Sequence, residues 1–306
     1  MSVAAIRART LSARAFLTIA VASCAALFLV VTSGAFVRLT GSGLGCENWP
    51  RCGDKPYPEQ GYHAFVEFGN RMVALVGILL ALATWLASRR VVGLSRAGHL
   101  AALLAFLLAF AQIPLGGVTI MLHLNPLAVM AHFLLGLTVL GLSVLVVVEA
   151  WGLLVGFARP AGALWLRRVV TYLGLPTCAA LLVTGAVATA SGPHPGSSED
   201  VARLGVSIVD TVYVHVRFAA AFGFGVIGIG FFLWRLRAPY PGVFRTWLLL
   251  LGVLVLQAMV GEVQYRNALP WGLVLFHVFL AATIWALSIL VTVFLWRPPA
   301  SLAGRQ

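Results

Sequence analysis

The chain has 306 residues, of which 61% are hydrophobic and only 10% are charged, and its mean hydropathy is +0.98. Soluble domains carry roughly 25% charged residues, so this composition excludes an ordinary soluble domain and predicts an all-α integral membrane protein. The formal net charge of +12 requires no nucleic-acid partner, because basic residues beside membrane spans and anionic lipid headgroups account for it.

Eight apolar stretches are long enough to cross a hydrocarbon core, which requires about 20 residues of helix. They occupy residues 14–36, 66–88, 97–121, 127–150, 165–190, 209–234, 243–264 and 271–296. We therefore expect a cytoplasmic N-terminal segment, a first four-helix repeat, a cytoplasmic linker, a second four-helix repeat and a cytoplasmic tail. Their boundaries are 1–13, 14–150, 151–164, 165–296 and 297–306.

The distribution of charge predicts the topology. Most of the arginines fall on one side of the eight-span arrangement, and that side carries a single acidic residue, Glu149. Because an excess of Lys and Arg marks the cytoplasmic side of a membrane, we expect both termini to be cytoplasmic. No small-x-small cleavage site follows the first apolar stretch, so we expect an uncleaved span and not a signal peptide.

Two connections on the opposite, outer side are long: residues 37–65 and 190–208. The first contains Cys46 and Cys52, separated by a stretch that includes Trp49 and Pro50. The outer face permits disulfides, and two cysteines are too few for a four-ligand zinc site. The pattern favours a disulfide between Cys46 and Cys52, with two free thiols as the alternative.

The chain repeats itself at an offset of 145 residues. Two tandem repeats of four helices keep one orientation, so their pseudo-two-fold axis would run along the membrane normal. Identical residues recur at this offset in the pairs Gln112 and Gln257, Gly116 and Gly261, His132 and His277, and Trp151 and Trp296.

Three histidines, His132, His215 and His277, lie inside apolar spans near their outer ends. Ionisable residues at that depth are costly and usually functional, although a single one can be an ordinary packing contact. His215 and His277 belong to the second and fourth helices of the C-terminal repeat, where they can face each other. Two imidazoles without thiolate or carboxylate ligands suit a haem iron better than zinc. Arg217 is a candidate partner for a haem propionate, with a surface arginine as the alternative.

The N-terminal repeat carries a different set at the same positions. His132 matches His277, but Asn70 stands where the other repeat has His215. An iron held there by His132 would keep one side open. Glu67 lies three residues before Asn70, and an acid beside an open iron site can donate or accept protons. Asparagine also serves as a contact between membrane helices.

These residues carry a family resemblance. The segments VRLTGSGLGCENWPRC (37–52), FVEFGNR (65–71) and NPLAVMAHFLLG (125–136), with the paired histidines, resemble the haem A synthase family. Members are duplicated eight-helix proteins that oxidise a methyl group of haem O to the formyl group of haem A. The family motif Glu-x-x-His-Arg is matched by Glu67 and Arg71, whereas Asn70 replaces its histidine. The family's disulfide in the first outer loop maps to Cys46 and Cys52.

The resemblance implies a haem b cofactor between His215 and His277, and haem O held by His132. We predict that Glu67 handles protons and that Arg71 positions the pocket or a propionate. The resemblance also implies the bacterial plasma membrane, cytochrome oxidase biogenesis, and as partners a haem O synthase, oxidase assembly factors and an electron donor. Two alternatives remain: a dihaem b-type electron-transfer protein, and a haem transfer or assembly protein without catalysis.

Overall fold

The computed structural model describes residues 10–46, 48–197 and 201–304, and within these ranges the regular structure is helical. The predicted spans are present as eight helices long and apolar enough to cross a membrane, so the prediction of an all-α membrane protein is confirmed. In chain order the elements are α1 (Ala13–Leu39), α2 (Tyr62–Ser88), α3 (Arg96–Met121), α4 (Pro126–Val155), α5 (Leu164–Val169), a π-helical turn (Val170–Gly174), α6 (Leu175–Ser191), α7 (Ile208–Arg235), α8 (Pro241–Arg266) and α9 (Trp271–Trp296).

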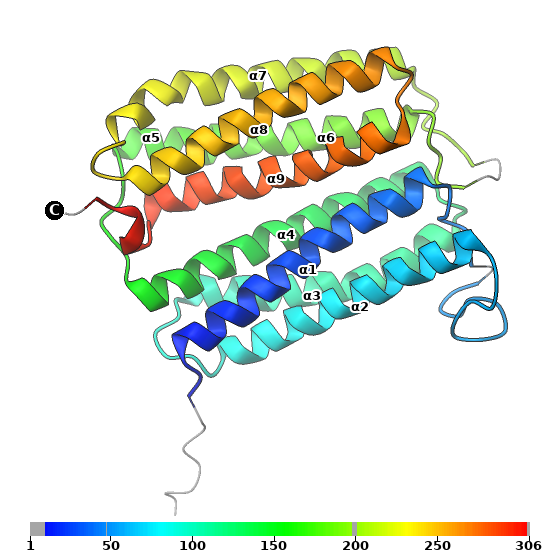
Figure 1. Ribbon diagram of the computed structural model, residues 1–306, viewed down its shortest axis with the longest axis horizontal. Coiled ribbons are helices and arrows are strands. Elements are labelled where there is room, and N and C mark those ends of the chain that lie inside the picture. Colours follow the sequence, from blue (N-terminus) through cyan, green and yellow to red (C-terminus); the bar gives the residue numbers. More distant parts are fainter. Residues whose placement is uncertain (1–9, 47, 198–200, 305–306) are drawn as a thin grey trace, which may run out of the picture.

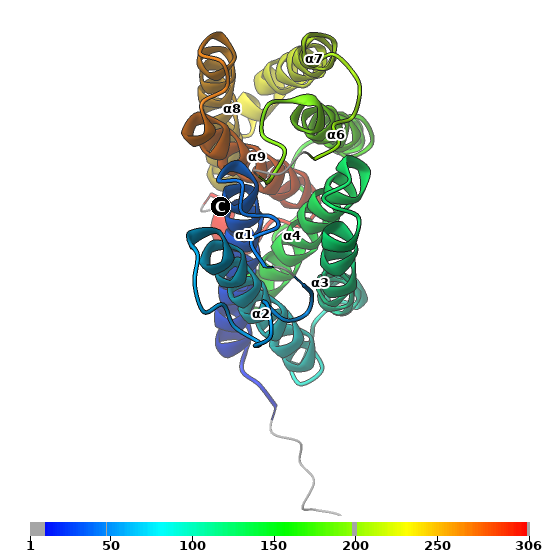
Figure 2. The same cartoon turned by 90° about the vertical axis from the view of Figure 1, so that its right-hand side faces the viewer.

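The helices form two groups that lie side by side (Figure 1). Helices α1 to α4 make up one group, α5 to α9 make up the other, and α1 and α4 contact α9 where the groups meet. Figure 2 shows the same arrangement from the end that carries both long connections, 40–61 and 192–207. We call this end the disulfide end; the start of α1 and the end of α9 lie at the opposite end.

The starts of several helices follow from short side-chain caps. Ser12 Oγ accepts from Ala15 N at 3.2 Å, and Ser95 Oγ accepts from Gly98 N at 3.0 Å. Such bonds satisfy amide groups that have no partner within the first helical turn. Asn125 caps α4 in the same way and is followed by Pro126, which suits the first position of a helix.

The fifth span, Leu164–Ser191, is one continuous helical segment with a π-helical turn at Val170–Gly174. Pro176 follows this turn directly after Leu175. Because proline lacks an amide hydrogen and its ring crowds the preceding turn, the local widening lets the helix continue past it.

Helices α2 and α4 extend furthest beyond their predicted limits. Helix α2 begins at Tyr62 instead of residue 66, directly after Gly61, whose φ of 94° favours glycine. Helix α4 continues to Val155, into the predicted linker 151–164, and ends at Gly156 with φ 80°. Residues 1–9 of the predicted 1–13 segment and residues 305–306 of the tail lie outside the described residues.

Close packing and buried polar contacts join the two groups. Trp285 Nε1 of α9 donates to the carbonyl oxygen of Leu137 in α4 at 2.8 Å. Gly141 permits this approach, because a Cβ there would lie 3.1 Å from Trp285 Nε1. Toward the opposite end, Arg297 forms an ion pair with the buried carboxylate of Glu149. The two groups therefore pack as neighbours along the length of α4 and α9.

Candidate functional site

His215 of α7 and His277 of α9 face each other within the C-terminal group. Their ring centroids are 6.3 Å apart and their planes differ by 62°. Two imidazoles bound to one metal from opposite sides, with metal–nitrogen distances of about 2 Å, have centroids about 6 Å apart. The structure thus brings the predicted pair to the separation required of two axial ligands of a single iron.

The hydrogen bonds around His215 determine which of its nitrogens is free. Thr184 Oγ1 lies 3.2 Å from His215 Nδ1 and donates its one hydrogen to the Leu181 carbonyl oxygen at 2.9 Å. The threonine oxygen therefore accepts from Nδ1–H, which leaves the lone pair of Nε2 available for a metal. Ligating histidines characteristically donate from their second nitrogen in this manner. No pattern in the sequence singles out Thr184.

Glycines provide the space for the two rings. A Cβ on Gly185 would lie 2.9 Å from His215 Cε1, and one on Gly261 would lie 3.3 Å from His277 Cε1. Gln257, one turn before Gly261 on α8, donates from Nε2 to the main-chain carbonyl of His277 at 3.1 Å. The helix that faces His277 thus fixes its backbone and leaves room for its ring.

The N-terminal group repeats this arrangement around His132. Gln112 Nε2 donates to the His132 carbonyl at 3.0 Å, and a Cβ on Gly116 would lie 3.5 Å from His132 Cε1. The turns that precede α4 and α9 also match, since each contains two consecutive residues with positive φ. These residues are His123 and Leu124 in one turn and Ala268 and Leu269 in the other.

Asn70 takes the place of the second imidazole in this group. Its Oδ1 lies 2.7 Å from Ser33 Oγ of α1, just as His215 lies beside Thr184 of α6. Ser33 and Thr184 are related by an offset of 151 residues (184 − 33), whereas Asn70 and His215 are related by 145 (215 − 70). The insertion between them hides this equivalence from a comparison at one fixed offset. Among the described residues, Asn70 and His132 share no hydrogen bond.

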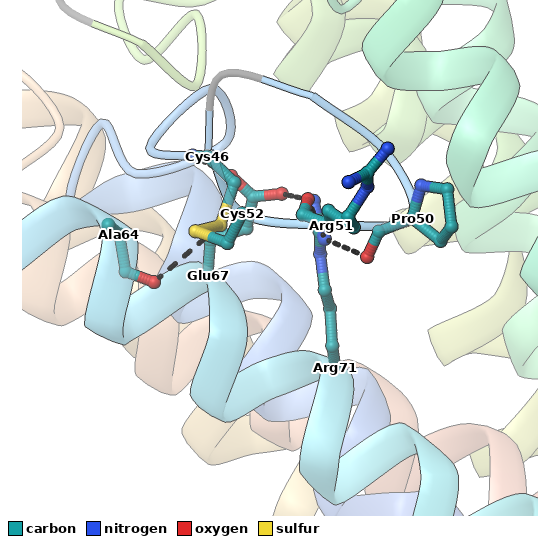
Figure 3. Close-up of a disulfide and its surroundings, with 7 residues drawn as sticks. All are labelled: Cys46, Pro50, Arg51, Cys52, Ala64, Glu67 and Arg71. Atoms are coloured by element: carbon teal, nitrogen blue, oxygen red, sulfur yellow. Dashed lines mark hydrogen bonds and ion pairs between the residues drawn. A yellow bond between two sulfur atoms is a disulfide. The ribbon is translucent and has the colours of Figure 1, made fainter. Parts of the chain in front are cut away.

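Glu67 and Arg71 hold the first long connection onto α2 (Figure 3). Glu67 is buried, with 5% of its surface exposed; its Oε2 accepts from Cys46 N at 2.9 Å and its Oε1 accepts from Arg71 Nη2 at 2.5 Å. Arg71 Nη1 also donates to the carbonyl oxygens of Pro50 and Arg51, each at 3.1 Å. Cys46 and Cys52 form the predicted disulfide. Both oxygens of the predicted catalytic carboxylate therefore already have partners in the loop and in Arg71.

Arg217, the predicted propionate partner, is exposed and lies over the ring of Tyr213 in its own helix, 3.0 Å from the centroid. Its Nη1 donates to the Tyr213 carbonyl at 3.1 Å. A second basic group, not identified from the sequence, lies at the disulfide end. Arg38 and Arg203 both donate to the Thr189 carbonyl, at 3.0 and 3.2 Å, and burial lowers the pKa of Arg203.

Arg203 also lines an open cavity of about 750 Å³ between the 192–207 connection and the turn before α9. Within the described ranges, no group of three or more His, Cys, Asp or Glu side chains is placed to hold a metal ion. The residues present do fit a haem, which supplies its own equatorial ligands and needs only axial ones from the protein.

The eight spans, with paired imidazoles between α7 and α9, are those of a multi-pass membrane protein with a candidate bis-histidine site. Residues 17–289 match the COX15-CtaA family, described as cytochrome oxidase assembly protein. Because this match covers most of the chain, the protein belongs to that family.

Three bacterial proteins named haem A synthase are similar to parts of this chain. The one from Geobacillus kaustophilus is 30% identical over 105 residues, covering 34% of this chain and 33% of the relative. The Bacillus pumilus protein is 29% identical over 109 residues, or 35% and 36% of the two chains. The Symbiobacterium thermophilum protein is 40% identical over 80 residues, or 25% and 26%. The three alignments therefore cover only 26% to 36% of the length of these curated relatives.

Proposed function

We propose that this protein is a haem A synthase, an oxidoreductase that converts the methyl group of haem O to the formyl group of haem A for cytochrome oxidase. The observation that carries the proposal is the difference between two equivalent positions. Thr184 holds His215 in one helix group, whereas Ser33 holds Asn70 in the other. One group can ligate iron from both sides, and the other from the His132 side only.

The C-terminal group is the proposed site of a resident haem b, held by His215 and His277. Bound there, the haem would store and transfer single electrons, which is the chemistry expected of an iron with two imidazole ligands. Arg217 remains our candidate for a propionate contact, which would require it to leave Tyr213. The protein's own contribution is to fix both rings, through Thr184 on one side and through the close approach of Gly261 on the other.

The N-terminal group is the proposed site of the substrate, haem O, with His132 as its protein ligand and Asn70 on the open side. In each of two successive oxidations the methyl carbon loses two electrons to an external oxidant and gains a hydroxyl whose oxygen comes from water or dioxygen. The products are an alcohol and then a gem-diol, which loses water to leave the aldehyde. Glu67 is the proposed proton-handling residue, and its carboxylate is fixed by Cys46 N–H and Arg71. Arg71, through its bonds to the loop carbonyls, positions the wall of this pocket.

The topology completes the proposal. With the arginine-rich end in the cytoplasm, both termini lie inside and the disulfide end faces outward, in the cell membrane of a bacterium. The repeats 14–150 and 165–296, joined by the linker 151–164, would then present both haem sites near the outer surface. The proposed partners are a haem O synthase, oxidase assembly factors, an electron donor and membrane lipid.

Asn70 distinguishes this function from that of a dihaem b-type electron-transfer protein, which would use an imidazole on each side of both irons. A haem transfer or assembly protein without catalysis would bind haem O and release it unchanged. Pyridine-haemochrome spectra of protein purified from cells that make haem O separate these functions. We expect haem A together with haem b; haem O with no haem A in folded protein that contains haem b would contradict the proposal.

A further inference from the structure

Gln112 and Gln257 occupy equivalent places beside His132 and His277. Each glutamine uses its amide nitrogen to bind the main-chain carbonyl of the histidine, at 3.0 and 3.1 Å. Its amide oxygen takes no part in this bond. In both residues Oε1 is buried and has no hydrogen-bond partner among the described residues.

Each of the two histidines also has a ring nitrogen without a hydrogen-bond partner among the described residues. Nδ1 of His132 and Nδ1 of His277 are also buried, and neither has a partner in the described part of the chain. His215 differs, because its Nδ1 is bonded to Thr184 Oγ1. Buried polar atoms are paired in the great majority of cases, and each unpaired one costs free energy. An unpaired acceptor and an unpaired nitrogen therefore lie at matching places in both helix groups.

Position along the helix places each glutamine one turn from the glycine that contacts the histidine ring. Gln257 precedes Gly261 by four residues on α8, and Gln112 precedes Gly116 by four residues on α3. Residues four apart lie on the same face of a helix, one turn from each other. Since each glycine lies against the Cε1 edge of the imidazole, each glutamine lies one turn further along the same histidine.

We propose that Gln257 and Gln112 are positioning residues that accept the Nδ1–H of His277 and His132, directly or through one water molecule. The inference rests on the proposed function, in which Nε2 of each histidine binds a haem iron. An imidazole that binds through Nε2 carries its hydrogen on Nδ1, and a ligating histidine normally donates that hydrogen to an oxygen. Gln257 thus accepts the Nδ1 hydrogen of His277, as Thr184 accepts that of His215.

The acceptor has a measurable electronic effect. A hydrogen bond from Nδ1–H makes the imidazole a stronger base toward iron and stabilises the ferric state. Hydrogen bonding around the axial ligands is one of the means by which a protein sets a haem potential. Removing the acceptor should therefore raise the midpoint potential of the haem that this histidine binds and leave the other haem unaffected.

The test compares Gln257→Leu, Gln257→Glu and the matched variant Gln112→Leu by redox titration of the low-spin haem in purified protein. Gln257→Leu removes the acceptor, and we expect it to raise the haem b potential by about 59 mV, a tenfold change in the one-electron equilibrium. Gln257→Glu keeps an oxygen at the same reach and should not raise it. Gln112→Leu makes the same chemical change in the other half and should leave haem b unchanged while less haem O co-purifies.

Two results would overturn the inference. One is an unchanged potential in Gln257→Leu; the other is a rise of similar size in Gln257→Leu and Gln257→Glu, which would indicate a packing effect alone. If Gln257→Leu retains no haem, a raised potential in Gln257→Glu decides against the proposal and an unraised one supports it. The proposed function fails separately, if the unmodified protein itself contains no low-spin haem.

Discussion

The imidazole rings of His215 and His277 lie with their centroids 6.3 Å apart, between the second and fourth helices of the second repeat. Thr184 fixes the hydrogen of His215 on Nδ1, so that its Nε2 is free. The two rings are therefore close enough to hold one iron between them, and each is placed by packing and, for His215, by a hydrogen bond.

Replacement of either His215 or His277 by alanine should abolish the low-spin haem b spectrum, because each change deletes an axial ligand. We expect at least a tenfold loss of low-spin haem per protein, measured by optical and electron paramagnetic resonance spectra. His123→Ala is the matched control, since the equivalent position in the other half is already Ala268 with similar φ. Retention of the low-spin signal in both His215→Ala and His277→Ala would show that the iron is held elsewhere.

Gly185→Ala should disturb the same site although it replaces neither of the two proposed iron ligands. Its Cβ would lie 2.9 Å from His215 Cε1, so the ring must move from the position that Thr184 holds. We expect haem affinity to fall by on the order of tenfold, as for other changes that misplace a ligand. Gly225→Ala on α7 meets no atom within 4 Å and should bind haem normally. Equal haem content in the two variants would show that the contact between a Cβ at position 185 and the His215 ring does not affect haem binding.

Cys46 and Cys52 should be bonded to each other in protein from oxidised membranes. Mass spectrometry without reductant is expected to find neither thiol alkylated, while Cys24 serves as the internal free cysteine. We expect part of the activity to survive loss of the bond, because Glu67 and Arg71 hold the loop independently. Full alkylation of both thiols in unreduced protein would contradict the assignment.

Glu67→Gln removes the carboxylate and keeps the size of the side chain. Haem b content should stay near normal while haem O accumulates unconverted, with haem A falling at least tenfold in pyridine-haemochrome spectra. Because Glu67 also binds Cys46 N–H, the disulfide must be shown to persist in this variant. Asp210→Asn, the same change at an exposed position of α7, should leave haem A formation intact. A normal haem A yield in Glu67→Gln would contradict the proton-handling role and show that the carboxylate only holds the loop.

The spans could be predicted from the sequence because a hydrocarbon core sets the length of each apolar helix. The predicted limits fail where a glycine ends or begins a helix: α4 runs on until Gly156, and α2 starts at once after Gly61. The facing of His215 and His277 was also predictable, because a fixed repeat places them on helices that pack in one bundle.

Other features depend on contacts that no sequence pattern signals. The bond from Cys46 N to Glu67 involves a main-chain group of a loop, so Glu67 gave no sign of holding that loop. Ser33 and Thr184 are equivalent at an offset of 151, because an insertion lies between the first and second helices of the N-terminal repeat. The sequence does not signal that each of them contacts the side chain at the equivalent position of the second helix. Arg38 at the end of α1 and Arg203 in the 192–207 connection meet at the Thr189 carbonyl, a contact between residues far apart in the sequence.

The central claim is that Asn70 leaves one side of the substrate haem open in this chain, and Asn70→His tests it most directly. Ser33 should hold the new ring as Thr184 holds His215, which closes the open side of the substrate haem. Low-spin haem per protein and haem A yield are then measured on the same purified sample. We predict a second low-spin haem together with slower haem A formation. Haem A formation at an equal or faster rate in Asn70→His would show that the missing imidazole is incidental and would contradict the account.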